Sequence, residues 1–133
     1  MKLTRASSYA IHALVFMAAQ KQNRPVASHH IAKARGIPER FLLKVLKPLV
    51  SARLLHSIKG PNGGYRLARA PSEITVLEIL EAVDGPIRGQ PSFSSEEGNG
   101  SLNKRLDRIC SQAAAQVRKQ LQKVRISELV GKN

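Results

Sequence analysis

The chain has few of the residues that form disulfide bonds or structural metal sites. Its 133 residues include one cysteine, Cys110, no tryptophan and only 4% aromatic residues. A single cysteine excludes an internal disulfide and any zinc or iron–sulfur site built from several cysteines of one chain. No apolar run approaches the ~18–20 residues needed to span a bilayer. The apolar segment near the N-terminus is interrupted by His12 and has the spacing of an amphipathic helix, so we expect a cytoplasmic protein with no membrane partner.

Acidic residues are nearly missing from the first half of the chain. Residues 1–69 contain thirteen Lys and Arg but one acid, Glu39, a balance of +12. Residues 70–99 carry −5 and residues 100–133 carry +6, which gives the net charge of +13. A basic half suits a polyanion, because Lys and Arg contacts with phosphates release condensed counterions. A solvated basic surface, or one that serves a membrane or a ribosome, would have the same composition.

Apolar spacing predicts two helices at the start of the chain. Residues 4–20 form the first, with Thr4 or Ser7 as its N-cap, and a polar loop follows. Ser28 is expected to cap a short second helix that runs to about Arg35. The side chains available to its inner side are Ile31, Ala32 and Ala34.

A third helix is predicted directly after a tight turn. Gly36 supplies the turn, and Pro38 opens the helix at its first position, where the missing N–H costs nothing. The helix runs to about Ala52, and Pro48 inside it should cost stability and kink it. Its expected buried face consists of Phe41, Leu42, Val45, Leu46, Leu49 and Val50.

Two helices joined by a short turn containing glycine form a helix-turn-helix, whose second helix enters the major groove by its N-terminal residues. That arrangement puts Glu39, Arg40 and Lys44 nearest the base edges. A helical corner with a charged face is the simpler alternative.

A glycine-rich hairpin follows, and it favours a DNA-binding function for the preceding helices. Residues 54–58 and 65–68 are short strand candidates around Lys59-Gly60-Pro61-Asn62-Gly63-Gly64. Glycines allow positive φ and a close approach to a phosphate chain. The loop lacks the GxxxxGK[ST] pattern and the following helix of a nucleotide-binding loop. The segment therefore predicts a β-wing, with Lys59 and Arg66 flanking the DNA backbone and Tyr65 packed under the hairpin.

Four segments carry a family resemblance, namely MKLTRASSYAIHAL, IAKARGIPERFLLKVLKPLV, KGPNGGYRLAR and ITVLEILEAVDGP. They are similar to the iron–sulfur cluster regulator family of bacterial winged-helix transcription factors, of the IscR, NsrR and CymR type. The match covers residues 1–87 well and the rest loosely. It implies a homodimer that binds a palindromic operator with two recognition helices and two wings, with Lys59 as the basic residue inserted in the minor groove.

The sequence departs from that family at several positions. Lys59 replaces the common arginine, and Leu43 stands where an acid often reads bases. Arg53 replaces a glycine before the wing, and a side chain there disfavours a positive φ. The family's three cluster cysteines would fall on Ser92, Gly98 and Lys104, so we expect no iron–sulfur cluster and no other cofactor or metal.

The chain changes character at Ile74. Thr75 and Glu78 fit a capping box for a helix that runs to Val83 and stops at Asp84-Gly85-Pro86. The acids Glu78, Glu81 and Asp84 are interpreted as a solvated face. Residues 89–101 have the composition of a mobile loop.

The last helix, about Leu102 to Arg125, is expected to make the dimer. Its apolar stripe requires a partner helix, and packing on its own domain is the alternative. Ser127 is expected to cap a final turn, and Cys110 is a packed residue or a candidate redox site. The stripe consists of Leu102, Leu106, Ile109, Ala113, Val117, Leu121 and Val124.

We therefore predict a mainly α protein with a small β-wing, in which residues 1–87 form a winged helix-turn-helix domain, 88–101 a mobile loop and 102–133 a dimerisation helix and tail. The predicted function is a sequence-specific DNA-binding regulator, more specifically a repressor, and not an enzyme, because no catalytic constellation is present. The alternative is control by a docked partner enzyme, or by a small-molecule or redox signal at the loop or Cys110. The predicted contacts with double-stranded DNA are Thr4, Arg5, Ser28, Pro38, Glu39, Arg40, Lys44, Lys59, Gly60, Asn62, Gly63, Tyr65 and Arg66.

Overall fold

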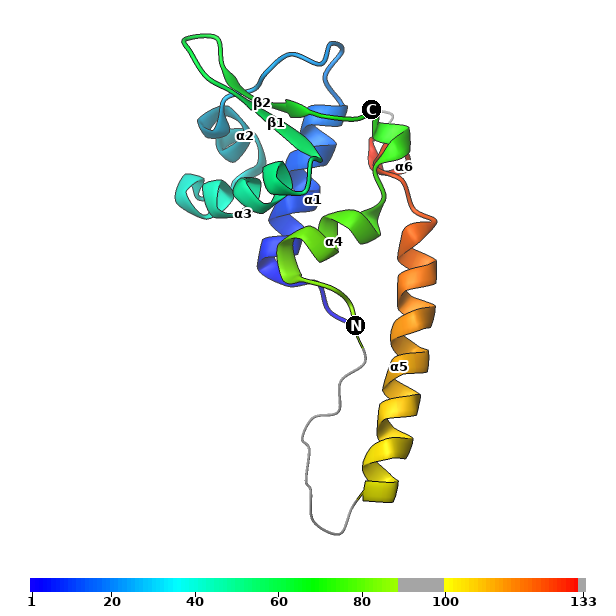
Figure 1. The fold of residues 1–133 in the computed structure, drawn as a ribbon. Helices are drawn as coiled ribbons and strands as arrows, with labels where there is room; N and C mark the ends of the chain where they lie inside the picture. Colours follow the sequence, from blue (N-terminus) through cyan, green and yellow to red (C-terminus); the bar gives the residue numbers. More distant parts are fainter. Residues whose placement is uncertain (89–99, 132–133) are drawn as a thin grey trace.

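Helix α1 is the centre of the fold. The computed structural model describes residues 1–88 and 100–131. Figure 1 shows α1 surrounded by α2, α3, α4, α6 and the wing, and each of these packs on it. Small residues on its inner side, Ala10 and Ala13, let the neighbouring helices approach closely beside Leu14. The elements are α1 (Arg5–Ala18), α2 (Ser28–Arg35), α3 (Glu39–Ser51), β1 (Leu55–Ile58), β2 (Gly64–Leu67), η1 (Pro71–Glu73), α4 (Val76–Asp84), α5 (Gly100–Gln122) and α6 (Ile126–Leu129).

The fold class predicted from the sequence, mainly α with a small β-wing, is confirmed, and α1 starts at the predicted cap, Thr4. α2 ends at Gly36 in a left-handed conformation, and Ile37 is buried. Two cap assignments were wrong by one position. Ala27 is the N-cap of α2 and Ser28 its first residue, while Pro38 is the N-cap of α3 rather than its first residue.

The buried faces of α2 and α3 are narrower than predicted. Ala34 is exposed, because α2 packs on α1 and α3 by one side only. Phe41 is 39% exposed, because it lies at the edge of the α1–α3 contact and not inside it. α3 continues through Pro48 to Ser51.

The wing is a two-stranded antiparallel hairpin. His56 faces Arg66 and Ser57 faces Tyr65 across the strands. Val26, in the loop before α2, exchanges two backbone hydrogen bonds of 2.8 Å with Tyr65, so the start of α2 is attached to the wing.

Two glycines make the wing's close contacts possible. A Cβ atom at Gly63 would lie 2.1 Å from the carbonyl oxygen of Ile58, and one at Gly64 would lie 2.4 Å from that of Val26. Any other residue would force the backbone apart at these points. Before the wing, Arg53 adopts φ 62, so its side chain does not prevent the left-handed conformation that we expected it to disfavour. The turn after α3 imposes it, through the Leu54 N–H donated to the carbonyl of Leu49 at 3.0 Å.

Helix α4 joins the winged domain to the C-terminal helices. The predicted capping box is present, with the Glu78 N–H donating to Thr75 Oγ1 at 3.1 Å and the Thr75 N–H to Glu78 Oε2 at 2.9 Å. α6 returns to this junction, where the Val76 N–H donates to the carbonyl of Val124 and the Ile126 N–H to that of Ile74, both at 2.9 Å.

The three acids of α4 lie on a partly exposed face, as predicted, but each also makes a contact within the fold. Glu78 accepts from Arg69 at 2.8 Å, and Glu81 accepts from Arg118 of α5. Asp84 accepts hydrogen bonds from the hydroxyls of Thr4 and Ser7 at the start of α1. A local sequence pattern does not indicate these contacts, because each partner lies nine or more residues away along the chain.

Helix α5 extends away from the rest of the molecule (Figure 1). It begins at Gly100, two residues before the predicted start, and ends at Gln122; residues 89–99 of the predicted loop lie outside the described residues. Within this helix no residue is fully buried. The final turn is α6, whose N-cap is Arg125 rather than Ser127. None of the described helices combines the length and apolarity needed to cross a membrane.

Candidate nucleic-acid interface

The N-terminal end of α3 presents an exposed charged surface. Glu39, Arg40 and Lys44 are all exposed, and Pro38 precedes them at the N-cap. The opposite side of the helix is anchored in the core by Leu42, which is fully buried. A helix held by one face and open along the other can be inserted into a groove by its first turns.

Arg40 and Lys44 both lie over the ring of Phe41. The guanidinium carbon of Arg40 lies 4.9 Å from the centroid of Phe41, and the ammonium nitrogen of Lys44 lies 5.8 Å from it. Such cation–π contacts stabilise by about 0.5–1 kcal/mol at exposed sites. Phe41 therefore limits the conformations of both cations before any ligand is bound.

Arg5 extends this surface onto α1. Thr4 is also exposed, but its side chain forms hydrogen bonds with other residues of the protein. Arg5 is exposed and borders a shallow cavity between α1 and α3 together with Phe41 and Lys44. The Thr4 side chain accepts from the Ser7 N–H at 3.0 Å and donates to Asp84, so its contacts in this structure cap α1.

The wing presents a second exposed segment. Lys59, Gly60 and Asn62 are exposed at its tip, and Gly63, Tyr65 and Arg66 are half-buried along the hairpin. The Gly63 N–H donates to the carbonyl of Gly60 at 3.0 Å and closes the tip as a tight turn. Ser28 is half-buried at the start of α2, two residues after Val26, which pairs with Tyr65. The sequence-predicted DNA contacts thus fall into two groups, one on α3 with Arg5 and one on the wing with Ser28.

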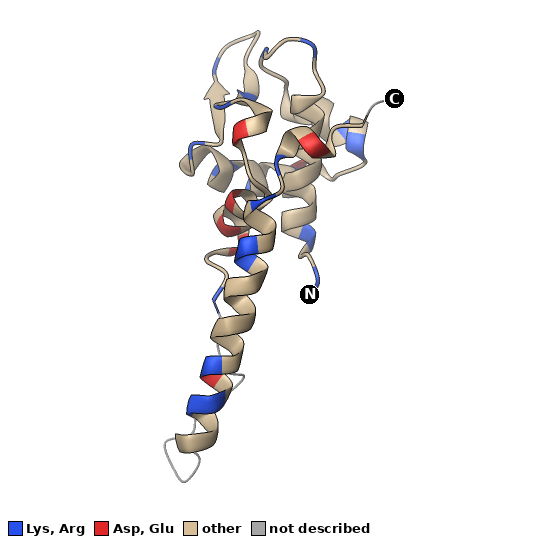
Figure 2. Cartoon of the chain, turned by 90° about the vertical axis from the view of Figure 1, so that its right-hand side faces the viewer, with Lys and Arg blue, Asp and Glu red and all other residues tan. Residues whose placement is uncertain are grey.

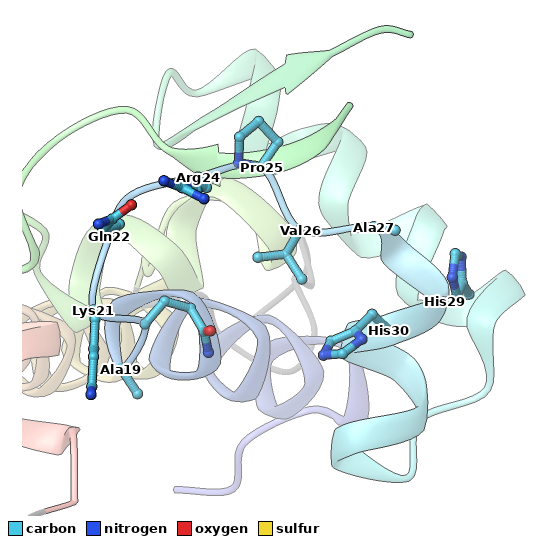
Figure 3. A pocket seen from close by; sticks show the side chains of 10 residues that line it. Ala19, Lys21, Gln22, Arg24, Pro25, Val26, Ala27, His29 and His30 are labelled. Atoms are coloured by element: carbon cyan, nitrogen blue, oxygen red, sulfur yellow. The ribbon is translucent and has the colours of Figure 1, made fainter. Parts of the chain in front are cut away.

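A basic concavity lies beside α2. Figure 3 shows its lining residues on the α1–α2 loop and the first turn of α2. Its volume is about 810 Å³. Lys21, Arg24, His29 and His30 are all exposed on its rim. Lys21 and Arg24 were not singled out from the sequence, where a charged loop is indistinguishable from a solvated one. Because Ala27 has no side-chain oxygen to cap α2, the first N–H groups of that helix also remain available to an anion.

Acidic residues are most concentrated on α4. Figure 2 shows them there, where the body meets α5, with further acidic residues on the short helices of the body and on α5; Lys and Arg lie on the loops at the opposite end and along α5. The pKa of Glu78 lies below its usual value. Burial alone would raise this pKa, but hydrogen bonds from the Thr75 backbone and from Arg69 outweigh burial. Glu78 and Glu81 therefore neutralise Arg69 and Arg118 within the fold, and Asp84 accepts hydrogen bonds from two hydroxyls of α1 and its cap, so none of the three lies on the α3 or wing surface.

The structure has a helix-turn-helix, α2 and α3, followed by a basic β-hairpin wing. This arrangement defines the winged helix-turn-helix class. Within that class, residues 3–132 match the Rrf2 family, described as iron-dependent transcriptional regulators, and the chain belongs to this family. It is a family of transcriptional regulators and not of enzymes.

Individual relatives agree with this assignment. The chain is 37% identical over 87 residues to an HTH-type transcriptional regulator of Mycobacterium tuberculosis H37Rv, covering 65% of this chain and 54% of that protein. It is 35% identical over 100 residues to IscR of Aliivibrio salmonicida, covering 75% of this chain and 60% of IscR. The chain thus spans little more than half the length of these relatives.

The fold is shared with solved regulators. CymR, the global cysteine regulator of Bacillus subtilis, superposes with a TM-score of 0.76 at 23% identity, covering 97% of this chain and 95% of CymR. IscR of T. potens superposes with a TM-score of 0.73 at 22% identity, covering 97% and 85% of the two chains.

Iron is the metal implied by the family description, but the donor set of this chain does not fit an iron–sulfur cluster. The whole sequence has one cysteine, and among residues 1–88 and 100–131 no group of three or more His, Cys, Asp or Glu side chains could hold a metal ion. Of the positions expected for cluster ligands, Lys104 is exposed on α5, while Ser92 and Gly98 lie outside the described residues. None of the three carries a thiol.

Proposed function

We propose that the chain is a sequence-specific DNA-binding repressor that acts as a homodimer on a palindromic operator without an iron–sulfur cluster. The observation that carries this proposal is the pair of exposed basic segments, the first turns of α3 and the tip of the wing, on one winged domain. A duplex offers a major groove wide enough for a helix and an adjacent groove for the wing.

Each segment would supply a different part of the binding energy. Arg40 suits the acceptors of guanine, and Glu39 suits the amino group of cytosine, so α3 would give sequence preference. Lys59 at the wing tip and Arg5 on α1 would contact the backbone or the minor groove, which gives affinity that falls with salt. Lys21, Arg24 and the start of α2 would add phosphate contacts beside the wing.

Helix α5 is proposed as the dimer element. Leu102 is 52% exposed and Ile109 is 60% exposed, and Ala113 beside them is also exposed. Leu106, Val117, Leu121 and Val124 are half-buried. An apolar edge of this length on a protruding helix is typical of an interface. A two-fold dimer would read half-sites about 34 Å apart on one face of the duplex.

A binding titration tests the DNA-binding part directly. The metal-free protein is titrated with its own upstream region and with a scrambled duplex of the same composition, at about 0.15 M salt, because lower salt inflates non-specific binding. We expect a preference of about 10³-fold or more for the upstream DNA. Equal, salt-sensitive affinity for both duplexes would contradict an autoregulatory operator that is read without a cluster.

The oligomeric state is tested separately by analytical ultracentrifugation. We expect a dimer for the wild type and a shift to monomer for Ile109→Glu, because a charge placed on the apolar edge of α5 is desolvated on association. Leu129→Glu, at an exposed apolar position on α6, is the matched control and should stay dimeric. A wild-type monomer at micromolar concentration would refute the α5 interface.

Repression is tested by joining the upstream region to a reporter gene and comparing expression with and without the protein. Higher expression with the protein would reverse the proposed sign. Control by a docked enzyme gains no support from α4, because Glu78, Glu81 and Asp84 are already bound to Arg69, Arg118 and the start of α1.

A further inference from the structure

The first turns of α3 expose two large apolar side chains among their charges. Phe41 is 39% exposed and Leu43 is 40% exposed. Single exposed apolar residues are common on protein surfaces. These two, however, flank Arg40 around the helix, because successive residues are about 100° apart. The part of α3 nearest a bound base would therefore present Arg40 between two apolar side chains, Phe41 and Leu43.

The apolar surface at Phe41 continues into a small cavity. The cavity has a volume of about 180 Å³ and lies between α1 and α3; it is lined by Ala6, Tyr9, Phe41 and Val45, with Arg5 and Lys44 at its edge. Both cations thus line a largely apolar cavity, and Lys44 also lies over the ring of Phe41. This combination fits an apolar group that is carried on a polyanion.

Double-stranded DNA has one apolar group of this kind in its major groove. Guanine presents two acceptors there, cytosine and adenine present amino groups, and thymine presents a carbonyl together with its C5-methyl group. Apolar side chains such as Phe and Leu can cover that methyl and remove it from water.

We propose that Phe41 and Leu43 are specificity-determining residues that read thymine C5-methyl groups on the steps beside a guanine contacted by Arg40. This inference rests on the proposed DNA-binding function and extends it to the base composition of the half-site. Phe41 also acts through Arg40 and Lys44, whose positions it limits by cation–π contacts.

The expected size of the effect follows from the burial of one methyl group. Removing a CH₂-sized group from water is worth about 0.8 kcal/mol, which converts to about a fourfold change in Kd. Replacing one thymine by deoxyuridine removes only the methyl and leaves base pairing and the carbonyl acceptor unchanged. Each thymine that is read should therefore cost about fourfold in Kd, and other thymines should cost nothing.

The experiment starts from a duplex selected by the full-length protein from a random library. Each thymine of the selected half-site is then replaced in turn by deoxyuridine, and Kd is measured at about 0.15 M salt for the wild type, Phe41→Ala and Leu43→Ala. Leu129→Ala, which removes a 42% exposed side chain on α6, is the matched control. Circular dichroism and the unfolding midpoint confirm that each variant is folded.

We expect the wild type and the control to lose about fourfold at one or more thymines beside a guanine. Each of the two variants should bind the thymine duplex more weakly and no longer respond to deoxyuridine at its own position. A wild type that ignores every replacement, or variants that respond like the wild type, would overturn the methyl-reading role while leaving the DNA-binding function intact. Failure to select any sequence above a scrambled duplex would instead remove the proposed function, and this inference with it.

Discussion

Asp84 is the residue whose loss should most affect the junction between α1 and α4. Its carboxylate accepts the hydroxyl of Ser7, whose side chain is fully buried, and the hydroxyl of Thr4 at 2.9 and 3.0 Å. In Asp84→Ala the Ser7 hydroxyl keeps its place in the core but loses its acceptor. The replacement therefore leaves a buried polar group unsatisfied, which is costlier than losing an exposed contact.

The magnitude can be assembled from these contacts. The unsatisfied Ser7 hydroxyl costs about 1–3 kcal/mol, and the exposed Thr4 contact about 0.5–1 kcal/mol. We therefore expect Asp84→Ala to lower the free energy of unfolding by about 1.5–4 kcal/mol, a large part of the roughly 5–15 kcal/mol typical of a domain. Asp84→Asn keeps an acceptor oxygen in the same place and should cost about 1 kcal/mol.

The change in the free energy of unfolding is measured by urea denaturation, with far-ultraviolet circular dichroism as the readout. All variants are compared at the same protein concentration, because association also stabilises the fold. The decisive comparison is the double variant Ser7→Ala/Asp84→Ala, which removes donor and acceptor together. It should be less destabilised than the sum of the two single variants by about 1 kcal/mol or more. Single losses that add within about 0.5 kcal/mol would refute the assignment of the cost to the Ser7–Asp84 hydrogen bond.

Four further changes test other parts of the molecule. Lys59→Ala should weaken DNA binding by about 1–3 kcal/mol in a fluorescence anisotropy titration, and an unchanged affinity would exclude Lys59 from the interface. Gly64→Ala should lower the unfolding midpoint in differential scanning calorimetry, because its Cβ would lie 2.4 Å from the Val26 carbonyl oxygen; an unchanged midpoint would mean that this contact relaxes freely. Arg53→Gly should raise the free energy of urea unfolding by up to about 1 kcal/mol, since glycine adopts φ 62 without strain, and a loss would show that the Arg53 side chain stabilises the turn. The pKa of Glu78 is lowered in the fold, so its contribution should be complete above pH about 4.5 and be lost as the pH falls through the lowered pKa; the stability gap to Glu78→Gln, measured by urea unfolding across pH, should narrow in that direction and not widen.

Local sequence patterns, namely helix caps, turn glycines and apolar spacing, predicted most of the helices and both strands. Gly36 and the capping box at Thr75 fixed where helices end and begin, and the glycines between Lys59 and Tyr65 located the wing within one residue. These features depend on backbone conformation and on side chains a few residues apart, which are visible in one dimension.

Cap positions were wrong by one or two residues, and the errors in predicted burial arose where distant segments meet. Phe41 has the spacing of a core residue, but whether it is covered depends on where α1 crosses α3. The stripe on α5 looked continuous, yet the fold divides it into half-buried Leu106 and Val117 and exposed Leu102 and Ile109. Periodicity gives the apolar side of a helix but not the neighbour that covers it.

The acids of α4 show how such long-range contacts bear on function. Counted along the chain, residues 70–99 carry −5 and would repel DNA beside a basic domain. In the fold, Glu81 is paired with Arg118 of α5, and Asp84 accepts hydrogen bonds at the start of α1. α4 thus connects α1, which packs against α3, to α5, the helix proposed to form the dimer. In a dimer formed through α5, the distance between the two α3 helices would depend on the angle at which α5 leaves the winged domain. The Glu81–Arg118 ion pair and the backbone hydrogen bonds that join Val76 to Val124 and Ile126 to Ile74 are contacts that support this angle.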